Sequence, residues 1–349
     1  MIPDTDRRSS QVFALHLAEA MRSHGHEADL LALHRGSQVV GLPVDPLEVG
    51  RSLKKDLRSA MSEADVTVAH GPAAGEECAR AAGRKLPFVY RQVRDTRFWS
   101  RRPPRQRDMP VYFRRARSVV AMSPGARSDL IDASGVAGSK VHVIPLGVPA
   151  AMFHPATPEE RSAARERLGL DAREFVAMTM GDLKPEKGVD FAIRAAVSTD
   201  AVRLVVVGDG PERLRLERLA EGLAPGRVMF VGHVERPIEA YAAANAVVHP
   251  SSSGDSMSAV LIEAGFCGLP VITTPIGSFE HVIEHGVNGL VVPSMDQYGL
   301  RAAMETLRLG RRGRERMGEE AHARAVARFD IEAIAKEWVR VLEPVVEQA

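Results

Sequence analysis

The sequence predicts an α/β protein built from two doubly wound domains, each with a parallel sheet. Short apolar runs alternate with amphipathic helical stretches along most of the chain, as expected for parallel strands joined by crossover helices. These runs form two series, and the stretch between them, residues 147–160, contains three prolines. A chain of 349 residues that is 45% hydrophobic is too long for one core and suits two domains.

The expected strands follow the apolar runs in order. The first series comprises residues 28–33, 65–70, 86–90, 118–123 and 141–147. The second series comprises residues 174–181, 202–210, 227–233, 245–251, 269–274 and 289–293. The expected domains are an N-terminal Rossmann-like domain (1–155), a C-terminal Rossmann-like domain (156–330) and a final helix that braces them (331–349). Ligands are then expected in a central cleft that the two domains face, outside the carboxyl ends of the strands.

The N-terminal domain lacks the strand with which such domains normally begin. The helix expected at 10–23 is preceded by little more than "MIPDTDRR", of which "MIP" is apolar. The first strand is therefore expected to be truncated. We favour a true start upstream of Met1 over a domain that tolerates a shortened strand.

Composition excludes several classes of protein. Lys and Arg number 46 and Asp and Glu 45, so the chain as a whole lacks the positive charge of a nucleic-acid binder. Cys78 and Cys267 lie in helical stretches rich in small residues, which predicts buried thiols in a reducing cytosol. No apolar run approaches the ~18 residues of a membrane span, and the N-terminus does not resemble a signal peptide. A cytoplasmic protein is expected.

The stretch "HPSSSGDSMSAVLIEAGFCGLPVITT" (249–274) places two carboxylates, Asp255 and Glu263, at the start and in the body of one expected helix. Eight helical residues advance ~12 Å, so the pair could contact both ends of an elongated ligand. Carboxylates accept hydrogen bonds from vicinal hydroxyls, and free N–H groups of the first helical turn bind anionic oxygens. A nucleotide-diphosphate sugar has this distribution of groups. The alternative is that Asp255 caps the helix and Glu263 is a solvated acid.

A second stretch, "MTMGDLKPEKGVDFAIRAA" (178–196), leads from a strand through a glycine turn into a helix whose first turn is expected to hold Lys187 and Gly188. A lysine there opposes the helix dipole, which favours anions at this end. It would be stabilised beside a bound phosphate. The alternative is an exposed lysine without a ligand.

Two other classes of site are not expected. "VVVGDGPERL" (205–214) begins like a dinucleotide fingerprint, but Arg213 stands at the third glycine position. The sequence has no G-x-x-x-x-G-K-[ST] phosphate loop and no H-E-x-x-H pair of metal ligands. No nicotinamide cofactor and no metal ion are therefore expected.

Several segments in the same order resemble the retaining nucleotide-sugar glycosyltransferases of family 4. They are "IPLGVPAAMFHP", "GDLKPEKG", "VVVGDGP", "VMFVGHV", "HPSSSGDSMSAVLIEAGFCGLPVITT" and "PIGSFEHVIEHGVNGLVV". The resemblance covers residues 141–345 specifically and residues 10–140 more loosely. It implies the GT-B fold, a nucleotide-diphosphate sugar as co-substrate, and a metal-independent hexosyltransferase-type reaction without a resident cofactor.

The resemblance also implies roles for individual residues. The catalytic group comprises His70 beside the reacting sugar, Asp255 near the transferred sugar and Lys187 on the phosphates. The donor-binding group comprises Glu263 at the ribose hydroxyls with Gly181, Asp182, Gly232, His233, Val234, Ser256, Met257, Ser258 and Ala259. The loop before the first helix, expected to face the donor phosphates, comprises Arg7, Arg8, Ser9 and Ser10. For His70 the alternative is a strand-end histidine with no role.

Two residues depart from the family pattern. Asp255 is one methylene shorter than the usual glutamate, which alters the sugar end of the site. Asp182 stands where a phosphate-binding arginine is usual, so a charge of the opposite sign lies near the diphosphate. We expect Asp182 to pair with a nearby base, either Lys184 or an arginine of the other domain.

The acceptor side is marked by an arginine-rich stretch. Residues 91–117 contain ten arginines, two acids and several aromatic residues. This composition predicts a site for an anionic acceptor or a patch that contacts the inner membrane face; the alternative is a solvated basic loop. The candidate residues of this patch are Arg91, Arg94, Arg97, Trp99, Arg101 and Arg102.

The expected function is transfer of a sugar from a nucleotide-diphosphate sugar to a hydroxyl of a small molecule, glycan or lipid-linked acceptor. No side chain is an obvious nucleophile, and the resemblance implies front-face transfer. Two alternatives remain: another GT-B enzyme, such as an epimerase or a phosphorylase, and a catalytically impaired homologue that binds sugar nucleotide or a partner chain.

Overall fold

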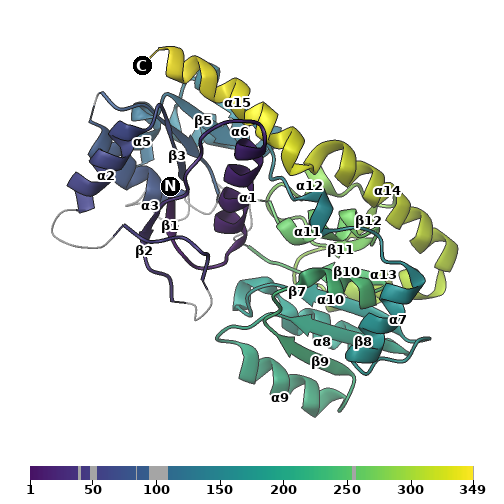
Figure 1. The fold of residues 1–349 in the computed structure, drawn as a ribbon. Coiled ribbons are helices and arrows are strands. Elements are labelled where there is room, and N and C mark those ends of the chain that lie inside the picture. The colour runs from purple at the N-terminus through teal and green to yellow at the C-terminus, as the bar shows by residue number, and fades with distance from the viewer. Residues whose placement is uncertain (38–40, 48–52, 84, 94–108, 254–256, 349) are drawn as a thin grey trace. The chain divides into compact units, whose positions relative to one another are not determined.

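The computed structural model describes residues 1–37, 41–47, 53–83, 85–93, 109–253 and 257–348 (Figure 1). The chain forms two compact units. Unit 1 comprises Met1–Pro149 and Phe329–Ala349, and unit 2 comprises Ala150–Arg328. Among the described residues, no helix combines the length and apolar character that crossing a bilayer requires.

Unit 1 contains two parallel sheets. Strand β1 (Ile2–Asp4) pairs with β2 (Ala32–His34), so the short segment before the first helix does form a strand, three residues long. The second sheet has the order β3-β4-β5-β6. Its strands are β3 (Thr67–His70), β4 (Phe88–Arg91), β5 (Ser118–Ala121) and β6 (Val141–Val143).

Helices cover both faces of the four-stranded sheet because its strands are apolar on both sides. Ala69 and Tyr90 pack against α2 (Leu53–Glu63), α3 (Pro72–Ala82) and α5 (Met109–Arg115). The next residues, His70 and Arg91, point to the opposite face, as strand alternation requires, and contact Phe13 of α1 (Ser9–Ser23). Helix α6 (Pro124–Ser134) connects β5 and β6.

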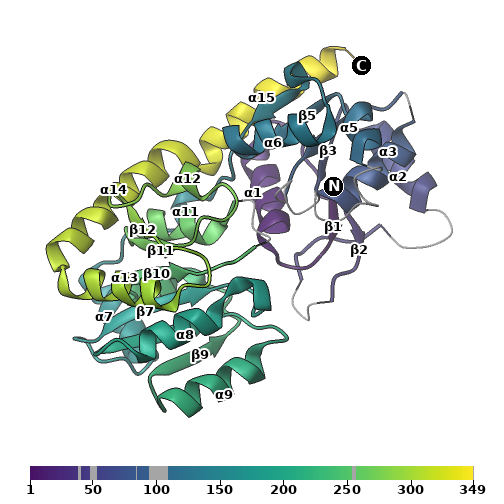
Figure 2. The same cartoon turned by 180° about the vertical axis from the view of Figure 1, so that it is seen from behind.

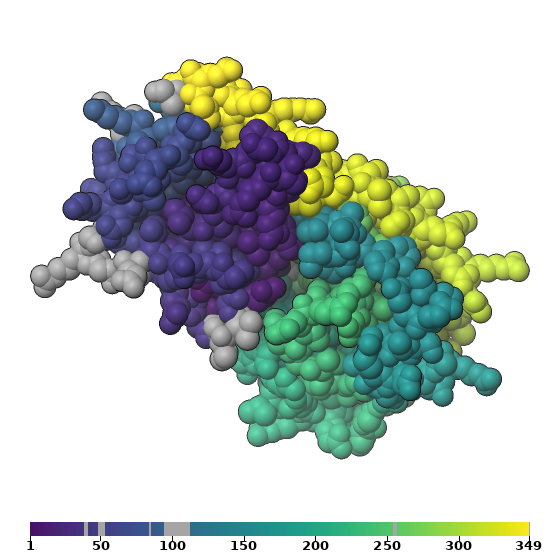
Figure 3. Space-filling model, in the orientation of Figure 1, coloured from purple at the N-terminus to yellow at the C-terminus, as the bar shows by residue number. Residues whose placement is uncertain are grey.

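The last helix, α15 (Ile331–Glu347), belongs to unit 1 and lies beside α1 (Figures 1 and 3). Its Trp338 is fully buried. Gly147 allows a close approach, because a Cβ atom there would lie 2.9 Å from a side-chain carbon of Ile331 and 3.1 Å from one of Ile334. The final helix is therefore part of the core of unit 1.

Unit 2 contains one parallel sheet of six strands in the order β12-β11-β10-β7-β8-β9. The strands are β7 (Phe175–Met180), β8 (Val202–Val207), β9 (Val228–Gly232), β10 (Ala246–His249), β11 (Val271–Thr273) and β12 (Gly289–Val291). The order reverses between β7 and β10, which lie side by side although about seventy residues apart, as the residue numbers of the pair Ala246–Ala177 show. Such a reversal leaves a crevice at the carboxyl ends of the two strands.

Helices flank this sheet on both faces (Figures 1 and 2). Helices α8 (Val189–Val197), α9 (Arg213–Leu223) and α13 (Gln297–Leu309) share one apolar core with the sheet. The remaining helices of the unit are α7 (Pro158–Arg167), α10 (Pro237–Ala243), α11 (Ala259–Phe266), α12 (Phe279–Val282) and α14 (Arg311–Phe329). The predicted α/β class with parallel sheets is confirmed in both units.

Candidate functional site

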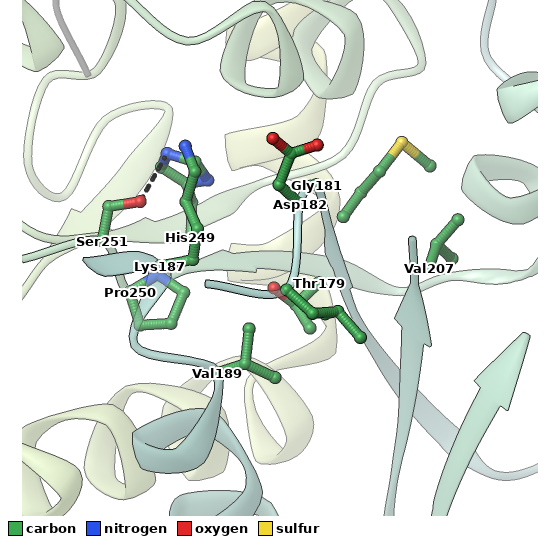
Figure 4. A pocket seen from close by; sticks show the side chains of 11 residues that line it. Thr179, Gly181, Asp182, Lys187, Val189, Val207, His249, Pro250 and Ser251 are labelled. Carbon is green, nitrogen blue, oxygen red and sulfur yellow. Dashed lines mark hydrogen bonds between the residues drawn. The ribbon is translucent and has the colours of Figure 1, made fainter. Parts of the chain in front are cut away.

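An open pocket lies in unit 2 at the point where the strand order reverses, with about 230 Å³ of empty space that includes adjoining solvent. It is lined by Thr179, Met180, Gly181, Asp182, Leu183, Lys187, Val189, Val207, His249, Pro250 and Ser251. These residues come from the carboxyl ends of β7, β8 and β10, from the loops that follow β7 and β10, and from the first residue of α8 (Figure 4). The pocket therefore occupies the place where doubly wound sheets bind their ligands.

Glycines bring two loops of the pocket wall into close contact. Gly208 has a φ of +126°, and a Cβ atom there would lie 2.0 Å from the carbonyl oxygen of Gly181. The amide of Gly181 donates to the carbonyl of Val207 at 3.0 Å, and that of Leu183 donates to Asp209 at 2.9 Å. The loops after β7 and β8 are thus joined along their backbones.

Lys187 reaches the pocket at the end of a single 3₁₀ turn, Pro185–Lys187, and not from the first turn of α8 as predicted. Gly188 follows with a φ of +63°, and a Cβ atom there would lie 2.3 Å from the carbonyl oxygen of Pro250. Ser252 donates its amide to the carbonyl of Glu186 at 2.8 Å. These contacts fix the turn that carries Lys187 to the end of β10.

Asp182 forms an ion pair with Lys184, whose Nζ lies 2.7 Å from Oδ2 of Asp182. The expected pairing of Asp182 with a neighbouring base is therefore confirmed, and the base is Lys184. Both side chains are about 40% exposed, at 40% for Asp182 and 39% for Lys184. Because the pair is held two residues apart on one loop, the negative charge at the pocket wall comes with a positive charge beside it.

His249 and Ser251 form the β10 side of the pocket, and sequence reasoning did not single them out. Ser251 Oγ lies 3.3 Å from His249 Nε2 (Figure 4), and both residues are buried. The hydroxyl of Thr274 donates to the carbonyl of Ser251. The signal that could have found them is their position at the end of an apolar strand in "VVHPSSS", next to the strand that precedes Lys187.

Glu263 lies in α11 and accepts a hydrogen bond at Oε2 from the hydroxyl of Tyr241 in α10, at 2.7 Å. Burial raises the pKa of the Glu263 carboxyl to about 7, and the hydrogen bond from Tyr241 opposes that rise. Burial, with the nearby Glu263, raises the pKa of Tyr241 well above its usual value, so this hydroxyl remains a donor. Glu263 does not line the pocket described above.

The start of α11 also lies near the carboxyl end of β10. Ser258 precedes the helix with extended backbone, and its side chain makes no capping hydrogen bond. Met257 is buried, and Ala259 is the first helical residue. Asp255, predicted near the transferred sugar, and Ser256, predicted to bind the donor, lie outside the described residues.

Gly232, His233 and Val234 were predicted to bind the donor; Gly232 ends β9, and His233 and Val234 follow it in the next loop. Gly232 has a φ of +80°, and its carbonyl accepts a hydrogen bond from the amide of Gly208 at 2.7 Å. This bond joins the loop to the pocket wall. The roles predicted for these three residues stay predictions.

In unit 1, His70 ends β3 and is buried between the rings of Phe13 and Trp338, with centroid distances of 6.2 Å and 6.3 Å. Burial, with the charges of the N-terminus and Arg91, holds the pKa of His70 well below its usual range, so the imidazole is neutral. Its Nδ1 has no hydrogen-bond partner among the described residues.

Arg91 does not lie on an exposed basic patch, and this part of the acceptor prediction is wrong. It is the last residue of β4, is 1% exposed, and its guanidinium lies 4.0 Å from the centroid of the Phe13 ring. Strand alternation turns it under α1, which the arginine-rich composition of the stretch did not reveal. The other residues of the predicted patch, Arg94, Arg97, Trp99, Arg101 and Arg102, lie outside the described residues.

Polar side chains in and next to the loop between β1 and α1 form hydrogen bonds with one another. Arg8 donates from Nη2 to Oδ2 of the buried Asp6 at 2.8 Å, and Ser10 donates to Gln11 at 2.6 Å. Arg7 is partly buried, and Ser9 is exposed. The predicted role of Arg7, Arg8, Ser9 and Ser10 at the donor phosphates stays a prediction. Among the described residues, no three His, Cys, Asp or Glu side chains cluster as metal ligands would.

Comparison with known families gives matches to both halves of the chain. Residues 10–151 match the family described as Glycosyltransferase Family 4, and residues 160–324 match the glycosyl transferases group 1. The chain belongs to the family 4 glycosyltransferases. The resemblance to family 4 glycosyltransferases that the sequence motifs indicate is thereby confirmed.

Among curated proteins, the chain resembles the D-inositol 3-phosphate glycosyltransferases. It is 35% identical over 184 residues to that of Acidothermus cellulolyticus, a match that covers 48% of this chain and 40% of the relative. It is 33% identical over 223 residues to that of Geodermatophilus obscurus, covering 59% of this chain and 48% of the relative. The matched part thus spans about half the length of these relatives.

Solved structures of similar shape are GT-B proteins. HepE of Anabaena, crystallised in complex with UDP and glucose, matches with a TM-score of 0.87 at 22% identity, over 98% of this chain and 97% of HepE. Sucrose-phosphate synthase of Thermosynechococcus elongatus matches with a TM-score of 0.84 at 21% identity, over 100% of this chain and 96% of the synthase. At these identities the likeness establishes the fold, which is GT-B.

Proposed function

We propose that this chain transfers a sugar from a nucleotide-diphosphate sugar to a hydroxyl acceptor, with retention of configuration at the anomeric carbon. The observation that carries the proposal is the pocket at the carboxyl ends of β7 and β10, to which Lys187 contributes. A lysine fixed at a glycine-rich strand end suits a diphosphate. Family membership and the UDP-bound state of the similar HepE structure support the same donor class.

In the proposed reaction, the bond between the anomeric carbon and the phosphate oxygen breaks while the acceptor oxygen attacks from the same face. The acceptor proton passes to the leaving phosphate oxygen, so no enzyme base is consumed. Lys187 and the free N–H groups at the start of α11 stabilise the negative charge that develops on the diphosphate. In this proposal Glu263 accepts hydrogen bonds from the ribose hydroxyls. The predicted role of His70, which is buried in unit 1, stays a prediction.

The acceptor in this proposal is a hydroxyl compound, and the relatives make a phosphorylated polyol the first candidate to test. D-inositol 3-phosphate, named in the relatives' descriptions, therefore belongs in the first acceptor screen. We propose a cytoplasmic reaction without a metal or a resident cofactor, since Lys187 supplies positive charge at the diphosphate.

Calorimetry against UDP, GDP and ADP, followed by their hexose conjugates, tests the donor class. One nucleoside diphosphate is expected to bind in EDTA, and its sugar conjugate is expected to be consumed when an acceptor is added. Proton NMR of the product then distinguishes retention from inversion at the anomeric carbon. Failure of every nucleotide to bind would contradict the proposal.

A binding protein without transferase activity is the second candidate, and Asp182 is the observation that favours it. A carboxylate replaces the arginine that the family uses on the phosphates, although Lys184 partly compensates it. Donor binding without hydrolysis or transfer in any acceptor screen would support this candidate. Any donor-dependent glycoside product would exclude it.

A further inference from the structure

Glu263 is a carboxylate with one oxygen held by the protein and one left available. Its Oε2 accepts the hydroxyl of Tyr241 at 2.7 Å. The residue keeps partial exposure, and Oε1 is not among the fully buried polar atoms that lack a partner. Since an ionised carboxylate accepts up to about four hydrogen bonds, most of its accepting capacity remains available to a ligand.

Tyr241 is rigid where it meets Glu263. It is 1% exposed, and the ring of Phe153 packs edge-on against it with a centroid distance of 5.9 Å. A buried phenol of this kind has few rotamers left, so it fixes the position of the oxygen that it contacts. The geometry therefore holds the carboxylate at one end and leaves the other end to a ligand.

The surroundings of Glu263 contain few charges. The titratable groups that face it are Tyr241 from α10 and Cys267, which follows α11. Burial raises the pKa of the Cys267 thiol, and that of Tyr241 is also raised, so both are neutral near pH 7. Among the described residues, no cation contributes to the pKa of Glu263. Tyr241 is thus the group that favours its ionised form.

We infer that Tyr241 is a positioning residue for the nucleotide: it fixes Oε2 of Glu263 so that Oε1 accepts the ribose hydroxyls, and nucleotide affinity follows ionisation of this carboxyl. The inference rests on the proposed function, because it needs a nucleotide at Glu263. It adds to that function a dependence of nucleotide affinity on pH. It also adds Tyr241, a residue outside the predicted site, as the group that sets this dependence.

The direction of the pH effect follows from the two forms of the carboxyl. The ionised form accepts hydrogen bonds at both oxygens, whereas the protonated form has one O–H that must itself find an acceptor. Burial raises the pKa of Glu263 to about 7. Affinity is therefore expected to rise with pH up to about 7 and to level off above it. Without the Tyr241 hydroxyl, the pKa rises further and the whole curve moves to higher pH.

The experiment measures the dissociation constant of UDP, or of whichever of UDP, GDP and ADP binds the wild type best, from pH 5.5 to 9. Wild type, Tyr241→Phe and Glu263→Gln are compared, with Tyr298→Phe as the matched control because Tyr298 is 74% exposed. The nucleotide phosphate also titrates in this range and changes the affinity. The Glu263→Gln variant lacks the titrating carboxyl, so its pH curve gives the contribution of the phosphate alone.

Tyr241→Phe is expected to weaken binding about fivefold at pH 6.5 and less than about twofold at pH 9, through the raised pKa of Glu263. Tyr298→Phe is expected to coincide with the wild type. After the Glu263→Gln curve is subtracted, the wild-type midpoint is expected near 7, and that of Tyr241→Phe above it.

A merely structural Tyr241 would give a different result, namely a loss of affinity that is equal at every pH or no loss at all, and either outcome overturns the inference. Failure of the proposed function looks different again. In that case the wild type binds none of the three nucleotides at any pH, although it is folded by circular dichroism.

Discussion

Polar residues end the central strands in both units, but they are satisfied in different ways. In unit 2, Asp182 pairs with Lys184 and Ser251 contacts His249, and these groups surround a pocket. In unit 1, His70 and Arg91 end β3 and β4 and are buried, each with a nitrogen that has no partner among the described residues. The indole nitrogen of Trp338 in the neighbouring α15 is likewise buried without a partner among those residues.

The difference separates two kinds of polar residue. A paired group at a pocket wall is held in place for a ligand at little cost to the fold. A buried donor without an acceptor costs stability, about 1–3 kcal/mol for each group. Substitutions in unit 2 are therefore expected to change binding with little change in stability, and substitutions in unit 1 are expected to change stability directly. Four substitutions test this contrast.

Trp338→Ala is expected to have the largest effect. Removing a fully buried indole costs about 3–5 kcal/mol, because a large cavity remains. The loss is expected in unit 1, whose core contains α15, so thermal unfolding should split into an early and a late transition. Differential scanning calorimetry measures this. A single transition at the wild-type temperature would show that α15 is not needed for the core.

Lys187→Ala is expected to weaken nucleoside diphosphate binding by about 2–3 kcal/mol, the usual loss for a charge-assisted contact to phosphate. Binding of the nucleoside without phosphates should hardly change, and the melting temperature should stay within one transition width of the wild type. Lys336→Ala, on an exposed position of α15, is the matched control. Equal losses for nucleoside and nucleotide would place Lys187 away from the phosphates.

Arg91→Met is expected to stabilise the protein by about 1–2 kcal/mol at pH 7, since a similar apolar side chain replaces a buried cation that has no carboxylate partner among the described residues. Burial lowers the pKa of Arg91 to about 9, so the folded state disfavours its charge. This cost is fully present below pH 9 and is relieved as the pH rises above it. Chemical denaturation at pH 7 and pH 10 measures the change. Destabilisation at pH 7 would mean that the contacts of the guanidinium with the Phe13 ring and Met122 outweigh the cost of burying its charge.

Asp182→Asn is expected to have the smallest effect, because the partner pair is about 40% exposed and such pairs contribute at most about 1 kcal/mol. Turnover should fall roughly threefold if Asp182 orients Lys184 toward the phosphates. Lys184→Gln should produce a similar fall. Faster turnover in Asp182→Asn would instead identify the carboxylate as a repulsive charge on the donor.

The strands from β3 to β12 could be predicted from the sequence because each is a short apolar run bounded by glycine, proline or polar residues. The three-residue strands β1 and β2 were not placed accurately in this way, since so short a run carries little pattern. Lys187 and Gly181 could be placed at a strand end for the same reason. His249 and Tyr241 could not, because their roles depend on which strands and helices become neighbours. Tyr241 in particular precedes Glu263 by twenty-two residues and meets it through the packing of α10 on α11. Arg91 shows that composition can also mislead. Its neighbours in the sequence are strongly basic, which suggested an exposed patch, but strand alternation turns its side chain into the core.

Unit 2 is one continuous segment, whereas unit 1 is completed by residues that follow it in the chain. During synthesis, the six-stranded sheet can therefore form before Ile331, Ile334 and Trp338 have left the ribosome. Helix α1 lacks its neighbour α15 throughout that interval. The first-made half of the protein can therefore complete its core only after the last helix has emerged.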